Sequence, residues 1–206
     1  MSKVEMTTLD RILMEAKKEF LDKGYQNASL REIVKNAGVT TGAFYGYYKN
    51  KEQLFDALVE DVYHNIFTMY REKLTTFFKQ SPNEQCDTMQ DTTYQCMVLM
   101  KTYMYEHYDV MKLLICCSQG TKYSNMVFDL ANLDVDATHE FAKNMESVDF
   151  EVKGVHAVLE RVLTKSMFQG FFDLIVQDVP IEEADEYILQ LLNFYTAGWY
   201  KIMGLQ

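Results

Sequence analysis

The sequence predicts an all-α protein of about nine helices, and three observations point to this class. Apolar residues recur at spacings of three and four through almost the whole chain, as they do on one face of an α-helix. No segment shows the apolar and polar alternation of a half-buried strand. The 206 residues include only two prolines and nine glycines, which are too few for the turns of an all-β domain.

The first helix is predicted over residues 7–23, where the apolar residues lie on one face. Gly24 is expected to end it, because glycine readily adopts the left-handed conformation found at helix C-termini. A second, short helix follows Ser29. The Ser29 hydroxyl can cap its first turn while the Glu32 side chain bonds back to the cap, and Gly38 is expected to end it.

Thr40 is predicted to cap a third short helix over residues 41–46. Two short helices separated by the turn at 37–40 are typical of a helix-turn-helix, whose second helix can enter the major groove of DNA. Asn50 is expected to cap a long fourth helix at about 51–80, which carries an unbroken apolar stripe.

The rest of the chain continues the same period in longer helices, predicted at about 84–107, 109–118, 122–147, 153–177 and 181–204. We therefore expect two domains. Residues 1–55 would form a three-helix helix-turn-helix domain, and residues 56–206 a larger helical domain for ligand binding and dimerisation. The fourth helix would bridge the two.

The net charge of −10 is unevenly distributed along the chain. Residues 1–55 carry a net charge of +2, and residues 56–206 carry −12. Because phosphate binding depends on Lys and Arg, any nucleic acid is expected to contact the first quarter of the chain. Charged residues throughout residues 1–20 and the absence of long apolar runs predict neither a secretory signal nor a membrane partner, and hence a cytoplasmic protein.

Four motifs in the first quarter of the chain occur in a fixed order. They are Ile12-Leu-x-x-Ala16-x-x-x-Phe20-x-x-x-Gly24-Tyr25, Ser29-x-x-x-Ile33, Ala37-Gly-Val-Thr-Thr-Gly42 and Tyr45-x-x-Tyr-Lys-Asn-Lys-Glu52-x-Leu-Phe55. Single pieces of this string are common, but the whole string resembles the DNA-binding domain of the TetR family of transcriptional regulators. The resemblance implies a homodimer that binds a double-stranded DNA operator.

The residues expected to contact DNA are those of the second and third helices and their flanks, namely Ser29, Arg31, Thr40, Thr41, Gly42, Ala43, Tyr45, Tyr47, Lys49 and Lys51. The Arg31 guanidinium could fork onto a guanine edge, onto a phosphate, or remain solvated. Ser29 and Thr40 are helix caps first, although a cap hydroxyl also suits a phosphate. Lys49 is equally suited to a phosphate contact or to a solvated surface position.

The resemblance implies base contacts from residues 41–43, a backbone and thymine-methyl contact from Tyr45, and a phosphate contact from Lys51. Tyr47 departs from the family pattern, which most often has a phosphate-binding histidine at this position. Gly42, Ala43 and Gly46 leave the recognition helix with few side chains. We therefore expect much of the sequence preference to come from DNA shape rather than from base contacts. Phe44 and Tyr48 are expected in the core.

The last two predicted helices are apolar around most of their circumference, so one face is left over after the domain's own core is filled. We expect a two-fold interface there, formed by Val158, Val162, Leu191, Tyr195, Gly198, Trp199 and Ile202. Such a dimer matches a palindromic operator with half-sites roughly 34 Å apart. The alternative is a monomer core that buries both faces.

The middle helices are rich in Met and Tyr, which suit a flexible cavity for an apolar or aromatic effector with one or two polar groups. The residues predicted to line it are Met100, Tyr103, Met104, His107, Cys117, Tyr123, Met126, His139, Phe168 and Phe172. The alternative is ordinary core packing. A bound ligand is expected to shift the fourth helix and so change the spacing of the recognition helices.

No catalytic motif is present in the sequence, so we predict that the chain is not an enzyme and has no cofactor. The four cysteines lack metal-ligand spacing, so no metal site is predicted. A ligand-released repressor is the favoured function. The sequence leaves two alternatives open, namely an activator of the same fold and a dimeric small-molecule-binding protein whose DNA binding is weak or lost.

Overall fold

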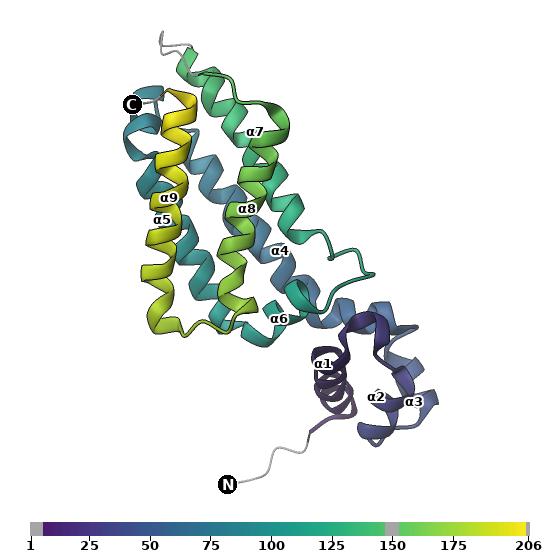
Figure 1. Ribbon diagram of the computed structural model, residues 1–206. Coiled ribbons are helices and arrows are strands. Elements are labelled where there is room, and N and C mark those ends of the chain that lie inside the picture. The colour runs from purple at the N-terminus through teal and green to yellow at the C-terminus, as the bar shows by residue number, and fades with distance from the viewer. Residues whose placement is uncertain (1–5, 147–152, 205–206) are drawn as a thin grey trace. The chain divides into compact units, whose positions relative to one another are not determined.

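The computed structural model describes residues 6–146 and 153–204. These residues form nine α-helices and no β-strand, so the predicted all-α class is confirmed (Figure 1). None of the described helices is both long and apolar enough to cross a membrane. In chain order they are α1 (Thr8–Asn27), α2 (Leu30–Asn36), α3 (Thr41–Tyr47), α4 (Lys51–Phe77), α5 (Pro82–Glu106), α6 (Tyr108–Cys116), α7 (Met126–Glu146), α8 (Ala157–Val176) and α9 (Ile181–Met203).

The chain divides into two compact units. The first unit takes the residues up to His64 together with His107–Ser124, and the second takes Asn65–Glu106 and the residues from Asn125 onward. Helix α4 runs without interruption through the boundary between the units. The predicted boundary at residue 55 separates a DNA-binding domain from a ligand-binding domain, which is a division by function and not by contacts. It stays a prediction.

An aromatic cluster forms the core of the first unit. Phe20 and Phe55 are fully buried, and their ring centroids lie 5.1 Å apart in an edge contact. Tyr25 and Tyr123 contact the Phe55 ring at 5.2 and 6.1 Å. The Tyr25 backbone N–H also donates a 2.8 Å hydrogen bond to the carbonyl of Cys117. Residues from the 107–124 segment thus complete a core that the N-terminal helices begin.

The junction between α1 and α2 differs from the predicted pattern in two respects. Gly24 interrupts α1 with φ 69° and ψ 164° instead of ending it, since α1 continues to Asn27. The Ser29 hydroxyl accepts the Glu32 N–H at 3.4 Å, as predicted. In place of the predicted return bond from Glu32, the Ser29 N–H donates to the buried Glu19 carboxylate at 3.0 Å. This bond, and next the Lys23 ammonium at 2.9 Å, lower the pKa of Glu19. A tertiary contact therefore replaces half of the expected local motif.

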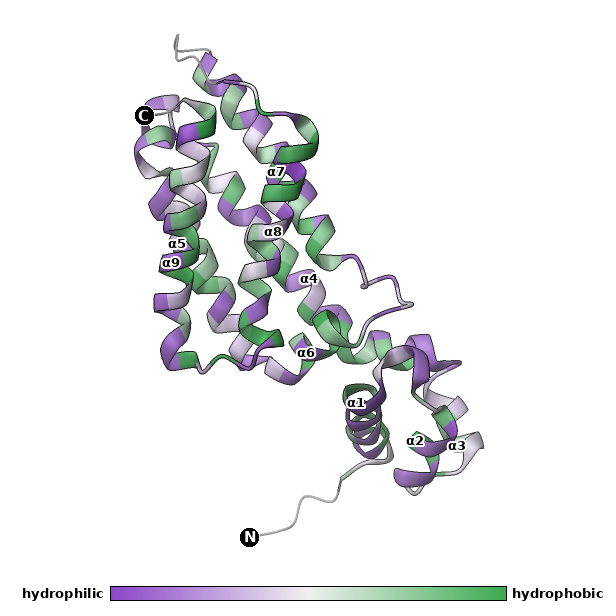
Figure 2. Ribbon diagram, viewed as in Figure 1, coloured by the Kyte–Doolittle hydropathy of each residue, from purple (hydrophilic) through white to green (hydrophobic). Residues whose placement is uncertain are grey.

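The second unit is a bundle of the second half of α4 with α5, α7, α8 and α9, in which α8 packs against both α7 and α9 (Figure 1). Figure 2 shows hydrophobic and hydrophilic residues alternating along these helices, as expected when each buries one face. Phe168, Phe171 and Phe172 of α8 are buried in its core.

Two helices of the bundle begin later than predicted. The residues from Ser118 to Asn125 form turns, in which Gly120 has φ 89°, so α7 begins at Met126 rather than at residue 122. The predicted end of α7 at residue 147 lies outside the described residues. Helix α8 begins at Ala157 rather than at residue 153, because the His156 side chain caps it by accepting the Val158 N–H.

Candidate DNA-contact surface, apolar face and cavity

A glycine turn sets the direction in which α3 leaves α2. Gly38 has φ 63°, in the left-handed region that favours glycine, and it follows Ala37, the C-cap residue of α2. The Thr40 hydroxyl accepts the Ala43 N–H at 3.1 Å, so the predicted cap of α3 is confirmed. The turn and the cap together hold the two helices in a helix-turn-helix.

Helix α3 has seven residues, of which only Phe44 is buried, at 1% exposure. This agrees with the core position predicted for Phe44. The adjacent tyrosines lie outside the core, because Tyr45 is 56% exposed and Tyr47 is 50% exposed. The Phe44 and Tyr45 ring centroids are 5.4 Å apart in an edge contact. A single aromatic side chain therefore anchors α3, and most of its remaining surface is free to meet a partner.

The structure leaves most of the predicted DNA-contact residues accessible on α2, α3 and their flanks. Those exposed to solvent are Arg31, Thr40, Thr41, Gly42, Tyr45, Tyr47 and Lys49. Ser29, Ala43 and Lys51 are partly buried. Helices α2 and α3 contact each other (Figure 1). Whether any of these ten residues touches DNA stays a prediction.

Lys51 occupies a structural position that the sequence did not suggest. Its ammonium donates to the backbone carbonyls of Tyr25, Gln26 and Ala28 at 2.6, 3.1 and 3.0 Å, and it lies 4.7 Å from the centre of the Tyr25 ring. A lysine ammonium has three protons, so all three are used here. Burial lowers the pKa of Lys51. Lys51 therefore clamps the end of α1 to the start of α4, and a phosphate contact would require it to exchange one of these bonds.

Replacing Lys51 by methionine is expected to lower the free energy of unfolding by about 1–3 kcal/mol, because three carbonyls lose a charged donor. Urea denaturation of the native and variant chains measures this difference. The matched control is Lys49→Met at an exposed lysine just before α4, which is expected to leave the unfolding free energy unchanged. Equal stability of the native chain and Lys51→Met would contradict the clamp.

Helices α8 and α9 expose an apolar face. A hollow on this face is lined by Leu163, Phe194, Tyr195, Ala197, Gly198, Trp199 and Ile202. Four residues of the predicted interface, Tyr195, Gly198, Trp199 and Ile202, are therefore gathered in one place, and Val158 and Val162 of α8 are exposed.

The seventh residue predicted for the interface, Leu191, is partly buried and lies against Gly170 of the same chain, and its place in an interface stays a prediction. A Cβ atom built on Gly170 of α8 would lie 3.0 Å from Leu191 Cδ1. Gly170 thus allows α8 and α9 to approach closely within one chain, and it gives Leu191 an intramolecular partner.

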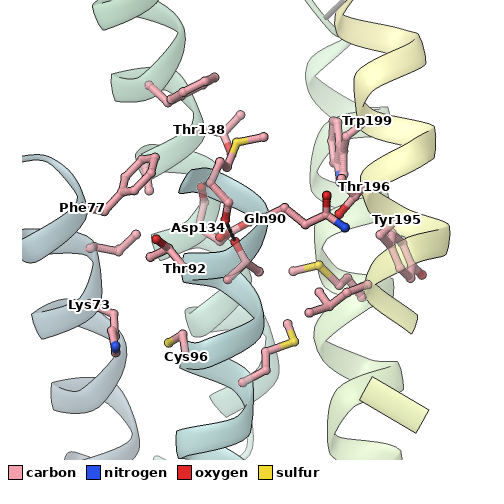
Figure 3. Close-up of a pocket in the computed structure, with 18 of the residues that line it drawn as sticks. Lys73, Phe77, Gln90, Thr92, Cys96, Asp134, Thr138, Tyr195, Thr196 and Trp199 are labelled. Atoms are coloured by element: carbon pink, nitrogen blue, oxygen red, sulfur yellow. Dashed lines mark hydrogen bonds between the residues drawn. The ribbon is translucent and has the colours of Figure 1, made fainter. Parts of the chain in front are cut away.

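The second unit contains a cavity of about 160 Å³ (Figure 3). Figure 3 shows Phe77 and Lys73 of α4 on one side and Tyr195, Thr196 and Trp199 of α9 on the other. The remaining lining residues are Tyr70, Leu74, Phe78, Met89, Gln90, Thr92, Thr93, Cys96, Met97, Asp134, Ala137, Thr138, Phe141, Met167, Leu192, Tyr200 and Met203.

None of the ten residues predicted for a ligand pocket lines this cavity. Met100, Met104, Met126, Phe168 and Phe172 are buried side chains that fill the bundle. The Tyr103 hydroxyl accepts a hydrogen bond from Asn65, and His139 Nε2 lies 3.0 Å from Glu160. His107, Cys117 and Tyr123 belong to the first unit. The cavity is thus lined by other residues, and a ligand pocket formed by the predicted set stays a prediction.

Different residues surround the cavity, and one of them left a signal in the sequence. Asp134 lies one helical turn from Leu130 on one side and from Thr138 on the other. A charged residue therefore stands on the face of α7 that also carries the buried Leu130. Charged residues are almost never buried unless they are paired, so a charged residue on such a face marks a position worth testing. Among the residues that the structure describes, no three His, Cys, Asp or Glu side chains are grouped as a metal site would require, and the four cysteines are free thiols.

The helix-turn-helix has counterparts among known proteins. The sequence profile of the bacterial regulatory proteins of the tetR family matches residues 12–58, which run from α1 through α2 and α3 into α4. The chain belongs to the TetR family. The matched segment contains both helix caps and Lys51.

Individual relatives of this TetR-family chain match it over a limited part of its length. YdgC of Bacillus subtilis, an uncharacterized HTH-type transcriptional regulator, is 39% identical over 56 residues, which are 27% of this chain and 29% of YdgC. KstR2 of Mycolicibacterium smegmatis, an HTH-type transcriptional repressor, is 31% identical over 67 residues, which are 32% of this chain and 33% of KstR2. The chain thus spans about a third of the length of the curated relatives it matches.

A likeness of fold extends over nearly the whole TetR-family chain. The crystal structure of SCO3833, a TetR-family member from Streptomyces coelicolor, matches with a TM-score of 0.60 at 16% sequence identity. The match covers 94% of this chain and 91% of SCO3833. The arrangement of helices beyond α4 is therefore shared even where the sequence is not.

Proposed function

We propose that this protein is a transcriptional repressor that binds a palindromic DNA operator as a homodimer and is released by a small ligand. The observation that carries the proposal is the exposed surface of α3, with Tyr45 and Tyr47 beside a capped N-terminus, within the segment shared with the TetR family. KstR2, which is 31% identical to this chain over 67 residues, is a transcriptional repressor. Like other regulators that act on DNA, the chain would work in the cytoplasm.

The homodimer would form through the apolar face of α8 and α9. Exposed large apolar side chains gather there, and a contiguous exposed apolar patch indicates a partner surface. A two-fold dimer would present two copies of α3 to two half-sites, and linking two weak sites raises the affinity of the pair. Residues 1–55 would then serve as the DNA-binding domain and residues 56–206 as the ligand-binding and dimerisation domain.

Helix α4 offers a route from the cavity to the DNA-binding residues. The second half of α4 contributes Tyr70, Lys73 and Phe77 to the cavity wall. At the start of the same helix, Lys51 clamps the end of α1. A ligand that binds the released state better than the DNA-bound state, by about 1–3 kcal/mol, would shift the population toward release.

The proposal is tested by titrating the purified protein into labelled DNA from upstream of its own gene and following fluorescence anisotropy at several salt concentrations. Arg31→Ala and Tyr45→Ala are expected to weaken binding, and Arg31→Ala is expected to reduce the salt slope by about one if Arg31 meets a phosphate. The matched control is Lys18→Ala, an exposed cation on α1 outside the predicted contact set.

The same titration separates the alternative functions. Equal affinities of the native chain, Arg31→Ala and Tyr45→Ala would contradict DNA binding by α2 and α3, and would favour a dimeric small-molecule-binding protein. A reporter gene placed behind the bound DNA distinguishes repression from activation, because repression lowers its expression.

A further inference from the structure

The cavity in the second unit has the lining of a site for an aromatic ring. Seven of its side chains are aromatic: Tyr70, Phe77, Phe78, Phe141, Tyr195, Trp199 and Tyr200. They come from α4, α7 and α9 and from Phe78, which directly follows α4, so they surround the space instead of lying on one wall. Aromatic side chains prefer edge or offset contacts with another ring, which suits a planar apolar group. Threonines and methionines fill most of the remaining wall.

The volume limits the size of the enclosed group. The cavity measures about 160 Å³. An engineered protein cavity of about 150 Å³ binds benzene, so a single ring with a short chain fills a space of this size. Larger polycyclic ligands would have to extend beyond the enclosed part.

Asp134 places a negative charge in this aromatic cavity. Its carboxylate accepts a hydrogen bond from the Tyr70 hydroxyl, and Figure 3 shows Asp134 between the α4 and α9 walls. Burial raises the pKa of Asp134 to about 6 against the lowering effect of the Tyr70 hydroxyl, and the Glu160 carboxylate adds to the rise. The carboxylate is therefore still mainly charged at neutral pH.

No cation balances this charge among the residues that the structure describes, where Asp134 forms no ion pair with Lys, Arg or His. Lys73 also lines the cavity, and it and Asp134 shift the pKa of the Cys96 thiol in opposite directions, but Lys73 forms no ion pair with Asp134. A second carboxylate, the buried Glu160, also raises the pKa of Asp134, and its own partner is His139 at 3.0 Å. Asp134 is partly buried, and a partly buried carboxylate with a like charge nearby is stabilised by a cation or a charged donor.

We propose that the cavity binds a protonated arylalkylamine, with its ring among the aromatic side chains and its ammonium group on the Asp134 carboxylate. The ammonium group would also gain from the aromatic faces around it, since Trp and Tyr rings attract cations. The inference rests on the proposed function in one respect only, because it takes this cavity as the effector site.

The test is calorimetric titration of the full chain, without DNA, using three probes of similar shape and different charge: 2-phenylethylamine, 2-phenylethanol and 3-phenylpropanoate. The native chain is expected to bind the amine about tenfold or more tightly than the alcohol, because a hydrogen bond to a buried charged group is stronger than one between neutral groups. The anion is expected to bind most weakly. An equal affinity for amine and alcohol, or the tightest binding for the anion, would overturn the inference.

Asp134→Asn removes the charge and keeps an oxygen that can accept from Tyr70. This variant is expected to lose the advantage of the amine while binding the alcohol as the native chain does, so retained alcohol binding also shows that the cavity is intact. The matched control is Asp136→Asn, an exposed carboxylate on the same helix, which is expected to change none of the three affinities. An unchanged preference for the amine in Asp134→Asn would overturn the role of Asp134.

The outcome is separable from that of the proposed function. If the amine binds as expected while the operator affinity stays unchanged, the ligand-released repressor fails and the amine site stands. If other ligands release the operator and the amine does not bind, the repressor stands and the amine site fails.

Discussion

In the variant Phe194→Glu, the protein is expected to sediment as a monomer at concentrations at which the native chain is expected to sediment as the proposed dimer. Phe194 is 74% exposed in the single chain, and it lines the hollow on α9 together with Tyr195 and Trp199. In a two-fold interface the new carboxylate of each chain enters the same apolar patch of its partner, close to a second copy of itself. Unfavourable charges at an interface cost several kcal/mol, so we expect dissociation to become easier by about 3 kcal/mol, or roughly a hundredfold in Kd.

Operator affinity is expected to fall with the dimer, because two half-sites are no longer bound as a unit. Sedimentation velocity measures the first effect, and anisotropy with operator DNA measures the second. The control is Phe128→Glu on α7, the same substitution at a side chain that is 47% exposed and lies outside the hollow. It is expected to remain dimeric. A Phe194→Glu chain as dimeric as the native protein would place the interface elsewhere.

Replacing Phe44 by alanine is expected to abolish DNA binding and to destabilise the first unit by about 3–5 kcal/mol. Phe44 is the only buried residue of α3, and its ring contacts those of Tyr45 and Tyr48 at centroid distances of 5.4 and 6.1 Å. Loss of this anchor leaves α3 too short to persist alone, since isolated helices of fewer than about 12 residues are marginal in water.

Two variants of α3 separate its anchoring from its contacts. Phe44→Leu keeps an apolar side chain in the core and is expected to retain most of the stability and the DNA binding. Tyr45→Ala removes an exposed side chain, so it is expected to leave the unfolding free energy within about 0.5 kcal/mol of the native value and to weaken DNA binding. Thermal denaturation and anisotropy on the same samples provide both measurements. A stable, DNA-binding Phe44→Ala chain would contradict the anchor.

Local chemistry explains why the fold could be predicted. The hydroxyl of Thr40 and the glycine conformations at Gly24 and Gly38 act within a few residues of the chain, so the sequence alone indicates where helices begin and end. The periodicity of the apolar residues also indicates which face each helix buries. The all-α class and the starts of the first four helices follow from these short-range effects.

Partners distant in the sequence explain what could not be predicted. The Ser29 N–H bonds to Glu19, ten residues away, and Lys51 bonds to carbonyls more than 20 residues away. The cavity depends on gaps between five helices, and the same Met and aromatic residues fill gaps or surround them according to small differences in packing. Asp134 acquires its significance only when Tyr70 of another helix lies beside it.

The contribution of residues 107–124 to the first unit limits how regulators of this kind can be recombined. The Asp109 carboxylate accepts from Lys17 at 2.8 Å, Tyr123 packs on Phe55, and Lys122 pairs with Asp56 at 3.2 Å. A chimera that joins residues up to 64 to the helices of another protein replaces every one of these contacts. A chimera that combines this DNA-binding unit with the ligand-binding helices of another protein therefore has to include both segments of the chain. Otherwise the contacts between the two segments have to be redesigned.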